Sequence, residues 1–445
     1  MIIRNLGPIS EVNISIRPYT VFFGDNGSGK TLTEYVIYGF MKYVRDVRVE
    51  SIFEIADVES LLHDKRSSFK TSEIISKLTD KIVTSFNKLG KNFYDELFAD
   101  KEIYVAGKTQ IIVDENDVKS LVIYKNNSSW YTEYRLGNND ALVRFSSKES
   151  DQNNELLLTM NVIKEMAASD ITSFGNDIVD NLKKEVGVEK IANSLTILAQ
   201  RLLFYRNNIN FIPAERIGIN MFRKDLINRR AEISFEDQAN NNNSLYPKPI
   251  SDYLLYLNKT LSNLNKHENG SKFVSEYKKE LIPGDFNYDS ELDSIVFSTQ
   301  DTKKIDFKLL SSSLKSLLGI DIVLLNVREG VDDINDVVFI DEPEMNLHPR
   351  RQRLIADLLY DLSQKTEMTI ILSTHSDYFI KETINKLLAE KRVGKYDKSQ
   401  FGVYEFTNNT VKHFDDITSE ENTEIANFDD TTKEILKTYY DLIED

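Results

Sequence analysis

The stretch GDNGSGKT, residues 24–31, decides the fold. The apolar run YTVFF (19–23) precedes it, and TLTEYVIYGFMKYV (31–44) follows with apolar residues at helical intervals. A strand, a glycine-rich loop and a helix in this order predict a P-loop, whose backbone N–H groups surround phosphate oxygens at the positive end of the helix dipole. Lys30 would reach the β- and γ-phosphates, and Thr31 would offer its hydroxyl to Mg²⁺. The expected phosphate-binding residues are Gly24, Asp25, Asn26, Gly27, Ser28, Gly29, Lys30 and Thr31.

The composition limits the classes of protein to consider. The chain has 445 residues, 41% of them hydrophobic, which predicts about two or three domains with a sizeable core. Its net charge of −16 argues against a surface that binds nucleic acid nonspecifically. It has no cysteine, which excludes disulfides, thiolate zinc sites and thiol catalysis. Without a signal-peptide core or an apolar stretch of membrane-spanning length, the sequence predicts a cytoplasmic protein with no membrane partner.

Two further apolar runs end in residues suited to phosphate chemistry. VVFI (337–340) predicts a strand of a parallel sheet, and Asp341 and Glu342 follow where it ends. We expect Asp341 to hold Mg²⁺ through water and Glu342 to orient or deprotonate the attacking water. MTIILSTHS (368–376) predicts a third strand, which would place His375 at the γ-phosphate end of the sheet. The plainer alternatives are a chance glycine turn, two acids that cap the next segment, and a histidine at a surface turn.

Three serines begin an apolar helical segment just before the strand predicted at VVFI (337–340). Ser311, Ser312 and Ser313 precede LKSLLGIDIVLL (314–325), and hydroxyls at the start of a helix predict an anion-binding end. The segment between Lys30 and Asp341 is far longer than one crossover connection requires. A large insertion is therefore expected to interrupt the nucleotide domain.

These pieces, in this order, resemble the ABC-type ATPases of the SMC-like and OLD-like branch. The resemblance covers residues 1 to about 380, loosely in the insertion, and rests on MIIRNLGPISEVNISI, GDNGSGKT, NFIPAER (210–216), SSSLKSL, FIDEPEMNLHP (339–349) and LSTHS. It implies an α/β fold, namely an ABC-type P-loop ATPase head with a large α+β insertion between the P-loop and the signature helix. It also implies ATP and Mg²⁺ as cofactors and a homo-oligomer built on ATP-sandwich dimers.

The same resemblance assigns roles in the dimer. Ser311, Ser312 and Ser313 would act on the γ-phosphate in the partner protomer, and MNLHP (345–349) would be the crossing loop at the interface. The family usually has glycine where this chain has Ser313. A side chain there would crowd the phosphate, which favours slow turnover and suits a switch better than a pump.

The chain is expected to divide into five parts. These are an N-terminal part of the ATPase core (1–44), a helical and β insertion (45–205), a helical and loop region (206–300), a C-terminal part of the core (301–390) and a small extension (391–445). Within the insertion we expect helices over 45–100, strand-like alternation over 101–124 and helix again over 155–206. After His375 we expect a helix over 377–392, a strand pair around GVYEFTNNTVKHF (402–414) and an acidic closing helix.

Two features outside these motifs bear on nucleic-acid binding. Trp130 is expected to pack in the protein rather than to stack on bases, because no basic cluster accompanies it. The segment 216–230 is locally basic, with Arg216, Arg223, Lys224, Arg229 and Arg230 against Asp225. A solvated helix face is the favoured interpretation, and a phosphate-binding edge is the alternative.

No Asp-x-Asp cluster follows His375, so we expect this chain to lack the TOPRIM nuclease that several OLD-like relatives carry. The resemblance then extends to the ATPases of two-component bacterial anti-phage systems. It implies a scaffold that holds a separate TOPRIM-type effector nuclease inactive and releases it on sensing a phage trigger protein. The alternative is an ATPase of DNA repair or of a Septu-like defence system that binds DNA directly; the net charge and the lack of sustained heptads make DNA the less favoured partner. The ATPase of a membrane transporter is disfavoured by the long insertion and the atypical signature.

Overall fold

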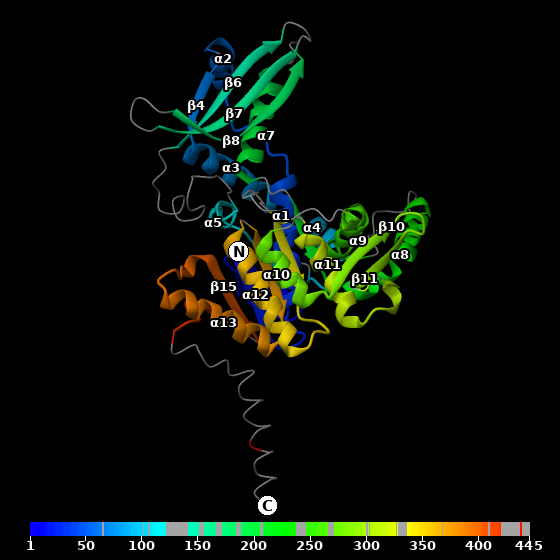
Figure 1. The fold of residues 1–445 in the computed structure, drawn as a ribbon. Coiled ribbons are helices and arrows are strands. Elements are labelled where there is room, and N and C mark those ends of the chain that lie inside the picture. The colour runs from blue at the N-terminus through cyan, green and yellow to red at the C-terminus, as the bar shows by residue number, and fades with distance from the viewer. Residues whose placement is uncertain are drawn as a thin grey trace, which may run out of the picture. The chain divides into compact units, whose positions relative to one another are not determined.

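The computed structural model divides into two compact units (Figure 1). The smaller unit comprises Met1, Phe40–Gly90 and Ile112–Arg206, and the larger comprises Ile2–Gly39, Lys91–Ile111 and Asn207–Asp445. The expected insertion over 45–205 differs from this division mainly in the segment 91–111, which belongs to the larger unit. The structure describes residues 1–64, 66–100, 102–105, 107–121, 141–150, 155–165, 171–183, 188–204, 208–236, 246–265, 271–299, 301, 303–325, 327, 336–366, 368–407, 410–419 and 437.

A six-stranded sheet forms the centre of the larger unit. Its strands lie in the order β16 (Val411–Phe414), β15 (Phe401–Phe406), β3 (Tyr19–Gly24), β14 (Thr369–Thr374), β13 (Val337–Asp341) and β9 (Ile209–Ile212). All neighbouring pairs are parallel except β15 with β16, which pair antiparallel. The carboxyl ends of β3, β13, β14 and β9 therefore meet at one edge, where ligands bind in open α/β sheets. This mixed α/β arrangement confirms the predicted fold class.

Helices cover both faces of this sheet. On one face, α1 (Lys30–Asp46) packs Tyr38 against Phe211 of β9 and Phe339 of β13, with ring centroids 5.6 and 5.5 Å apart. On the other face, α11 (Ser312–Leu324), α12 (Pro349–Lys365) and α13 (Asp377–Arg392) contribute to one hydrophobic cluster with alternate residues of the strands. The strands read as continuous apolar runs because both of their faces are buried.

The remaining elements of the larger unit surround this layered core. A small sheet has the order β2 (Ile9–Asn13), β1 (Ile2–Leu6) and β5 (Gln110–Ile112), and a second has the order β10 (Gly284–Asp289), β11 (Ser294–Thr299) and β12 (Lys304–Asp306). The other helices are α4 (Lys91–Phe98), α8 (Arg216–Glu236), α9 (Lys248–Thr260), α10 (Lys272–Leu281) and the short 3-10 helices η2 (Leu261–Asn265), η3 (Phe307–Leu309) and η4 (Lys398–Gln400). In the described part of the chain, no helix combines the length and apolarity needed to cross a membrane.

The smaller unit is built on a four-stranded antiparallel sheet. Its order is β4 (Arg66–Lys70), β6 (Ala141–Ser150), β7 (Glu155–Glu165) and β8 (Ile171–Lys183), and its helices are α2 (Ile55–Asp64), α3 (Thr71–Phe86), α5 (Glu115–Lys119) and α7 (Val188–Phe204). The helix predicted over 155–206 is wrong for its first half, which forms β7 and β8. A short apolar run such as LLLTMNVI suits either structure by periodicity, and antiparallel pairing with β6 and β8 decides in favour of a strand.

Other local predictions met mixed outcomes. Among the described residues of 101–124, the predicted strand-like alternation yields one strand, β5, because Asp114 caps α5 with a capping box that ends the extended segment. The helix over 377–392 and the strand pair β15–β16 are confirmed. Trp130 and the predicted acidic closing helix, apart from residue 437, lie outside the described residues.

Candidate active site

The P-loop lies at the carboxyl edge of the sheet, between β3 and α1. Gly24, Gly27 and Gly29 have φ values of 122°, 71° and 102°, which side chains other than hydrogen rarely allow. A Cβ at Gly24 would stand 2.0 Å from the carbonyl oxygen of Phe406, and one at Gly29 would stand 2.5 Å from Cγ1 of Ile9. Close packing thus requires glycine at two of these positions, whereas Gly27 has open space and needs glycine for its backbone conformation alone.

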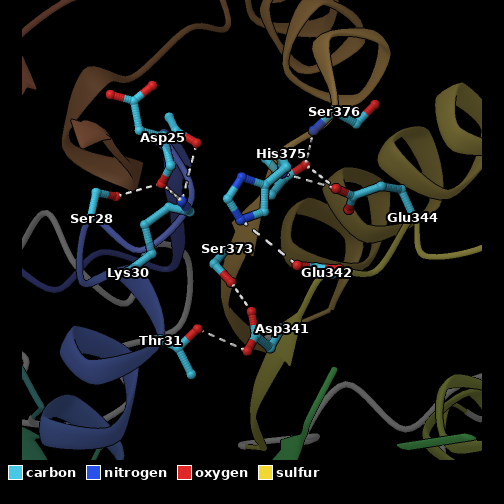
Figure 2. A network of polar contacts seen from close by, with 12 residues as sticks. Asp25, Ser28, Lys30, Thr31, Asp341, Glu342, Glu344, Ser373, His375 and Ser376 are labelled. Atoms are coloured by element: carbon cyan, nitrogen blue, oxygen red, sulfur yellow. Dashed lines mark hydrogen bonds and ion pairs between the residues drawn. The ribbon is translucent and has the colours of Figure 1, made fainter. Parts of the chain in front are cut away.

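The side chain of Lys30 folds back onto the loop. Its Nζ donates to the carbonyl oxygens of Gly24 at 3.1 Å and of Asp25 at 2.6 Å (Figure 2). Burial lowers the pKa of Lys30 to about 8, against the opposing attraction of Asp341 and other nearby carboxylates. An ammonium group that rests on neutral carbonyls can exchange them for phosphate oxygens, so the loop fits the triphosphate of ATP.

Thr31, Asp341 and Ser373 bring α1, β13 and β14 together. Asp341 accepts a hydrogen bond from Thr31 Oγ1 at 3.0 Å through one carboxylate oxygen and another from Ser373 Oγ through the other (Figure 2). Asp341 is buried, with 6% of its surface exposed. A hydroxyl and a carboxylate side by side at a phosphate loop are the donors that Mg²⁺ takes from proteins when substrate phosphates complete its shell. The residues present therefore fit the expected cation.

Glu342 and His375 stand next to this pair. Glu342 Oε1 lies 3.7 Å from His375 Nε2, and in Figure 2 the imidazole lies between the P-loop and Glu342. Burial, and then the neighbouring Asp341 charge, raise the pKa of Glu342, while burial lowers the pKa of His375. A carboxylate with a raised pKa is a better proton acceptor near neutral pH than an exposed one. The arrangement can thus activate a water molecule beside the γ-phosphate position.

Two buried glutamates that the sequence reasoning missed support the site. Glu344 Oε1 accepts from Thr374 Oγ1 at 2.7 Å and from the backbone N–H of His375 at 3.0 Å, which fixes the residue after β14. Glu34 of α1 is fully buried near Asp341, and burial raises its pKa well above the usual range. The only sequence signal for Glu344 was the run DEPE, in which a second acid follows the predicted pair.

The signature serines do not join the P-loop cluster in this chain. Ser311 caps α11 by accepting from the N–H of Leu314 at 3.3 Å, and Ser313 Oγ accepts from Arg351 of α12 at 3.5 Å. Within the described residues, their hydrogen bonds stay in α11 and α12. Their role toward a second protomer's nucleotide remains what the resemblance implies.

The basic segment 216–230 differs from its favoured interpretation. Arg216 is fully buried, and Arg223 is buried in an ion pair with Asp293, so neither lies on a solvated helix face. Lys224 donates to the carbonyl oxygen of Leu292 at 2.9 Å. The prediction was wrong for both arginines because tertiary partners, which the local charge pattern does not reveal, enclose them.

One family model and several solved structures are similar to this chain. The family model described as AAA ATPase domain (AAA_15) matches residues 1–380. Similar solved structures include an Smc head bound to the C-terminal winged-helix domain of ScpA, which has 11% sequence identity, covers 93% of this chain and 95% of that chain, and has a TM-score of 0.33. The SMC head domain from Thermotoga maritima has 11% identity, coverage of 93% and 96%, and a TM-score of 0.30. A Pyrococcus furiosus Smc head domain with an extended coiled coil, bound to the C-terminal domain of ScpA, has 10% identity, coverage of 93% and 94%, and a TM-score of 0.32.

No curated protein matches the chain. The family assignment therefore rests on the family model and on the residues that the sheet brings together. The family model matches most of the chain, from the first strand to just beyond His375. This chain belongs to the family of AAA ATPase domains.

Proposed function

We propose that this chain hydrolyses ATP slowly at the P-loop as one half of an ATP-sandwich dimer. The observation that carries the proposal is the convergence at one sheet edge of Lys30, the Thr31–Asp341 pair, Glu342 and His375. The match to an ATPase family supports the activity. The serine at 313, in place of the usual glycine, supports slow turnover because its side chain narrows the approach to phosphate.

Each residue has a role set by its position. The P-loop N–H groups and Lys30 would bind the phosphates, and Thr31 and Asp341 would hold Mg²⁺, which neutralises phosphate charge. Glu342 would accept the proton of the attacking water as the water oxygen bonds to the γ-phosphorus and the bond to the leaving β-phosphate oxygen breaks. His375, held through its backbone by Glu344, would donate to a γ-phosphate oxygen.

Phosphate release measured with three proteins tests this assignment. The wild type should turn over ATP, Glu342→Gln should bind ATP without turnover, and Lys30→Ala should lose binding. Equal hydrolysis by the wild type and Glu342→Gln would remove Glu342 from the catalytic role.

The biological role that we propose is that of a sensor and scaffold in bacterial anti-phage defence. The motifs resemble most those of AriA, the ATPase subunit of the PARIS system, in which an oligomeric ATPase sequesters a TOPRIM-type nuclease and releases it on sensing a phage protein. The net charge of −16 and the enclosure of Arg216 and Arg223 within the protein support a protein partner over DNA. An interface that depends on bound ATP is a two-state element, and a trigger that binds one state better shifts the population.

A pull-down from cells that express Glu342→Gln beside its native genomic neighbours tests the role. The protein would be captured with ATP and Mg²⁺, and the bound material would be identified by mass spectrometry and assayed for nucleic acid. A stoichiometric nuclease with little DNA supports the scaffold. Abundant DNA without a protein partner, bound with steep salt dependence, would instead favour the repair or Septu-like alternative.

A further inference from the structure

Arg216 connects three segments that are far apart in the sequence. It begins α8 directly after the turn that follows β9, and its side chain is fully buried. Nε donates to the carbonyl oxygen of Ser316 in α11 at 2.8 Å, and one terminal nitrogen donates to the carbonyl oxygen of Asp341 at 2.9 Å. The other terminal nitrogen donates to the carbonyl oxygen of Glu342 at 2.7 Å. One guanidinium group therefore spans the signature helix and the turn that carries the catalytic acids.

The cost of burying this cation indicates a specific task. Burial lowers the pKa of Arg216, and the partners that its hydrogen bonds reach are backbone carbonyls rather than a carboxylate. Burying a charge is costly before such bonds form, so the bonds that Arg216 makes must offset that cost. Packing alone thus gives little reason for arginine at this position, whereas its planar set of donors fixes the distance between two backbone segments.

The backbone of Glu342 needs such a support. Glu342 has a φ of 50°, in the left-handed region, where a residue with a side chain is strained and persists only when its surroundings hold it. Three bonds hold the backbone of Glu342: its N–H donates to Ser373 O at 3.0 Å, and its carbonyl oxygen accepts from the N–H of Met345 at 3.1 Å and from Arg216. The bond from Arg216 also fixes Glu342 relative to α11, because Arg216 contacts Ser316 at the same time.

We propose that Arg216 is a positioning residue that couples the signature helix to Glu342. When the serines at the start of α11 engage the nucleotide of a second protomer, a shift of α11 passes through Ser316 and the guanidinium group to the peptide of Glu342. The carboxylate then reaches its working position only in the assembled dimer. This inference rests on the proposed hydrolysis at Glu342 and adds a reason why an isolated protomer would turn over ATP poorly.

Arg223 provides a matched control on the same helix. It is also buried, and its hydrogen bonds go to Asn258 Oδ1 at 2.7 Å and to Asp293, neither of which belongs to α11 or to the site. A lysine at either position keeps the charge and loses the planar donor set. Both substitutions should lower the melting temperature, and only Arg216→Lys should alter the chemical step.

The experiment measures the ATP dissociation constant, kcat and melting temperature for the wild type, Arg216→Lys and Arg223→Lys. Arg216→Lys should keep the dissociation constant within about threefold and lower kcat about 100-fold, the effect expected when a catalytic group moves by about 1 Å. Arg223→Lys should keep both values within about threefold of the wild type. If Arg216→Lys does not fold, Arg216→Gln, which removes the buried charge, replaces it.

A double-mutant cycle separates coupling from general damage. Ser311→Gly removes the hydroxyl at the start of α11 and weakens the helix cap only slightly, because glycine is also accepted at this position. If Arg216 relays the state of α11, the double variant should lose no more activity than the worse single variant, whereas independent effects would multiply.

Each remaining outcome decides the matter. If the wild type does not hydrolyse ATP, the proposed function fails and the inference fails with it. If the wild type is active and Arg216→Lys keeps kcat within threefold, or the cycle is multiplicative, the inference alone is wrong. If neither Arg216 variant folds while Arg223→Lys does, Arg216 serves folding and the coupling role is refuted.

Discussion

Replacing Ser373 with alanine removes one of the two hydroxyl groups that hold Asp341. Ser373 is 1% exposed, and its hydroxyl donates to Asp341 Oδ1, while Thr31 Oγ1 donates to Oδ2 at 3.0 Å. A hydrogen bond to a charged group contributes about 1.5–3 kcal/mol. Without it, the carboxylate can rotate away from the position at which it would meet Mg²⁺. We therefore expect Ser373→Ala to weaken the Mg²⁺-dependent part of ATP affinity about 10- to 150-fold, the equivalent of that energy.

The assay compares ATP binding with Mg²⁺ and with a chelator, using a fluorescent ATP analogue. In the chelator, the wild type and Ser373→Ala should bind within about twofold of each other, because the P-loop and Lys30 are unchanged. With Mg²⁺, only the wild type should gain the full increase in affinity. This difference separates a loss of metal positioning from a general loss of structure, which would lower both values.

Ser376 provides the control for this prediction. Its hydroxyl donates to Gln352 Oε1 at 2.6 Å and caps α13 by accepting from the N–H of Phe379, but it does not contact Asp341. Ser376→Ala should cost about 1 kcal/mol of stability as a lost cap and leave the Mg²⁺ effect intact. The reasoning is refuted if Ser373→Ala keeps its Mg²⁺-dependent affinity within threefold, or if Ser376→Ala loses as much.

Three further predictions concern the loop and its supports. Gly24→Ala should prevent folding of the larger unit, because the new Cβ would stand 2.0 Å from a backbone oxygen of β15. Gly27→Ala meets no neighbouring atom and should cost about 1–2 kcal/mol of backbone strain. Equal melting temperatures of the two variants would contradict this. Glu344→Ala leaves two buried donors without their acceptor and should lower the free energy of unfolding by about 2–5 kcal/mol in urea, with a smaller loss for Glu344→Gln; a loss under 0.5 kcal/mol or so would contradict it. Lys30→Ala should abolish the stabilisation of about 2.7 kcal/mol that ATP gives at 100 times its dissociation constant; a retained shift in melting temperature would exclude Lys30 from binding.

The parts of the site that the sequence predicted share a physical reason. Lys30, Asp341 and His375 each follow an apolar run that was predicted as a buried strand and forms one, and parallel strands bring their carboxyl ends to one edge. The cluster therefore follows from local patterns and one rule of sheet geometry. Where two structures share a local pattern, as in the apolar run of β7, the pairing partners decide, and the sequence alone favoured the wrong one.

The supports of the site were invisible for a different reason. Arg216 lies in a segment rich in positive charge, and such a segment usually predicts an exposed helix face. That prediction fails where carbonyl oxygens from distant segments surround the cation. Three of its acceptors, the carbonyl oxygens of Ser316, Asp341 and Glu342, lie 100 or more positions away in the sequence, and a fourth is the nearby carbonyl oxygen of Pro213. Burial by distant segments is a property of the assembled sheet, so it requires the structure.

In the proposed dimer, the site would be divided between two copies of the chain. One chain gathers its cation, carboxylates and histidine at the sheet edge, while the hydroxyls of Ser311 and Ser313 make their bonds within α11 and to Arg351 of α12. The side chain of Arg216 contacts both α11 and the turn that follows β13. If a second copy supplies serine hydroxyls to the phosphate, turnover depends on assembly only when binding of that copy changes the position of Glu342. A rigid guanidinium group between α11 and the backbone of Glu342 meets this requirement directly. The activity per protomer should therefore depend on protein concentration in the wild type, and this dependence should be lost when Arg216 is replaced.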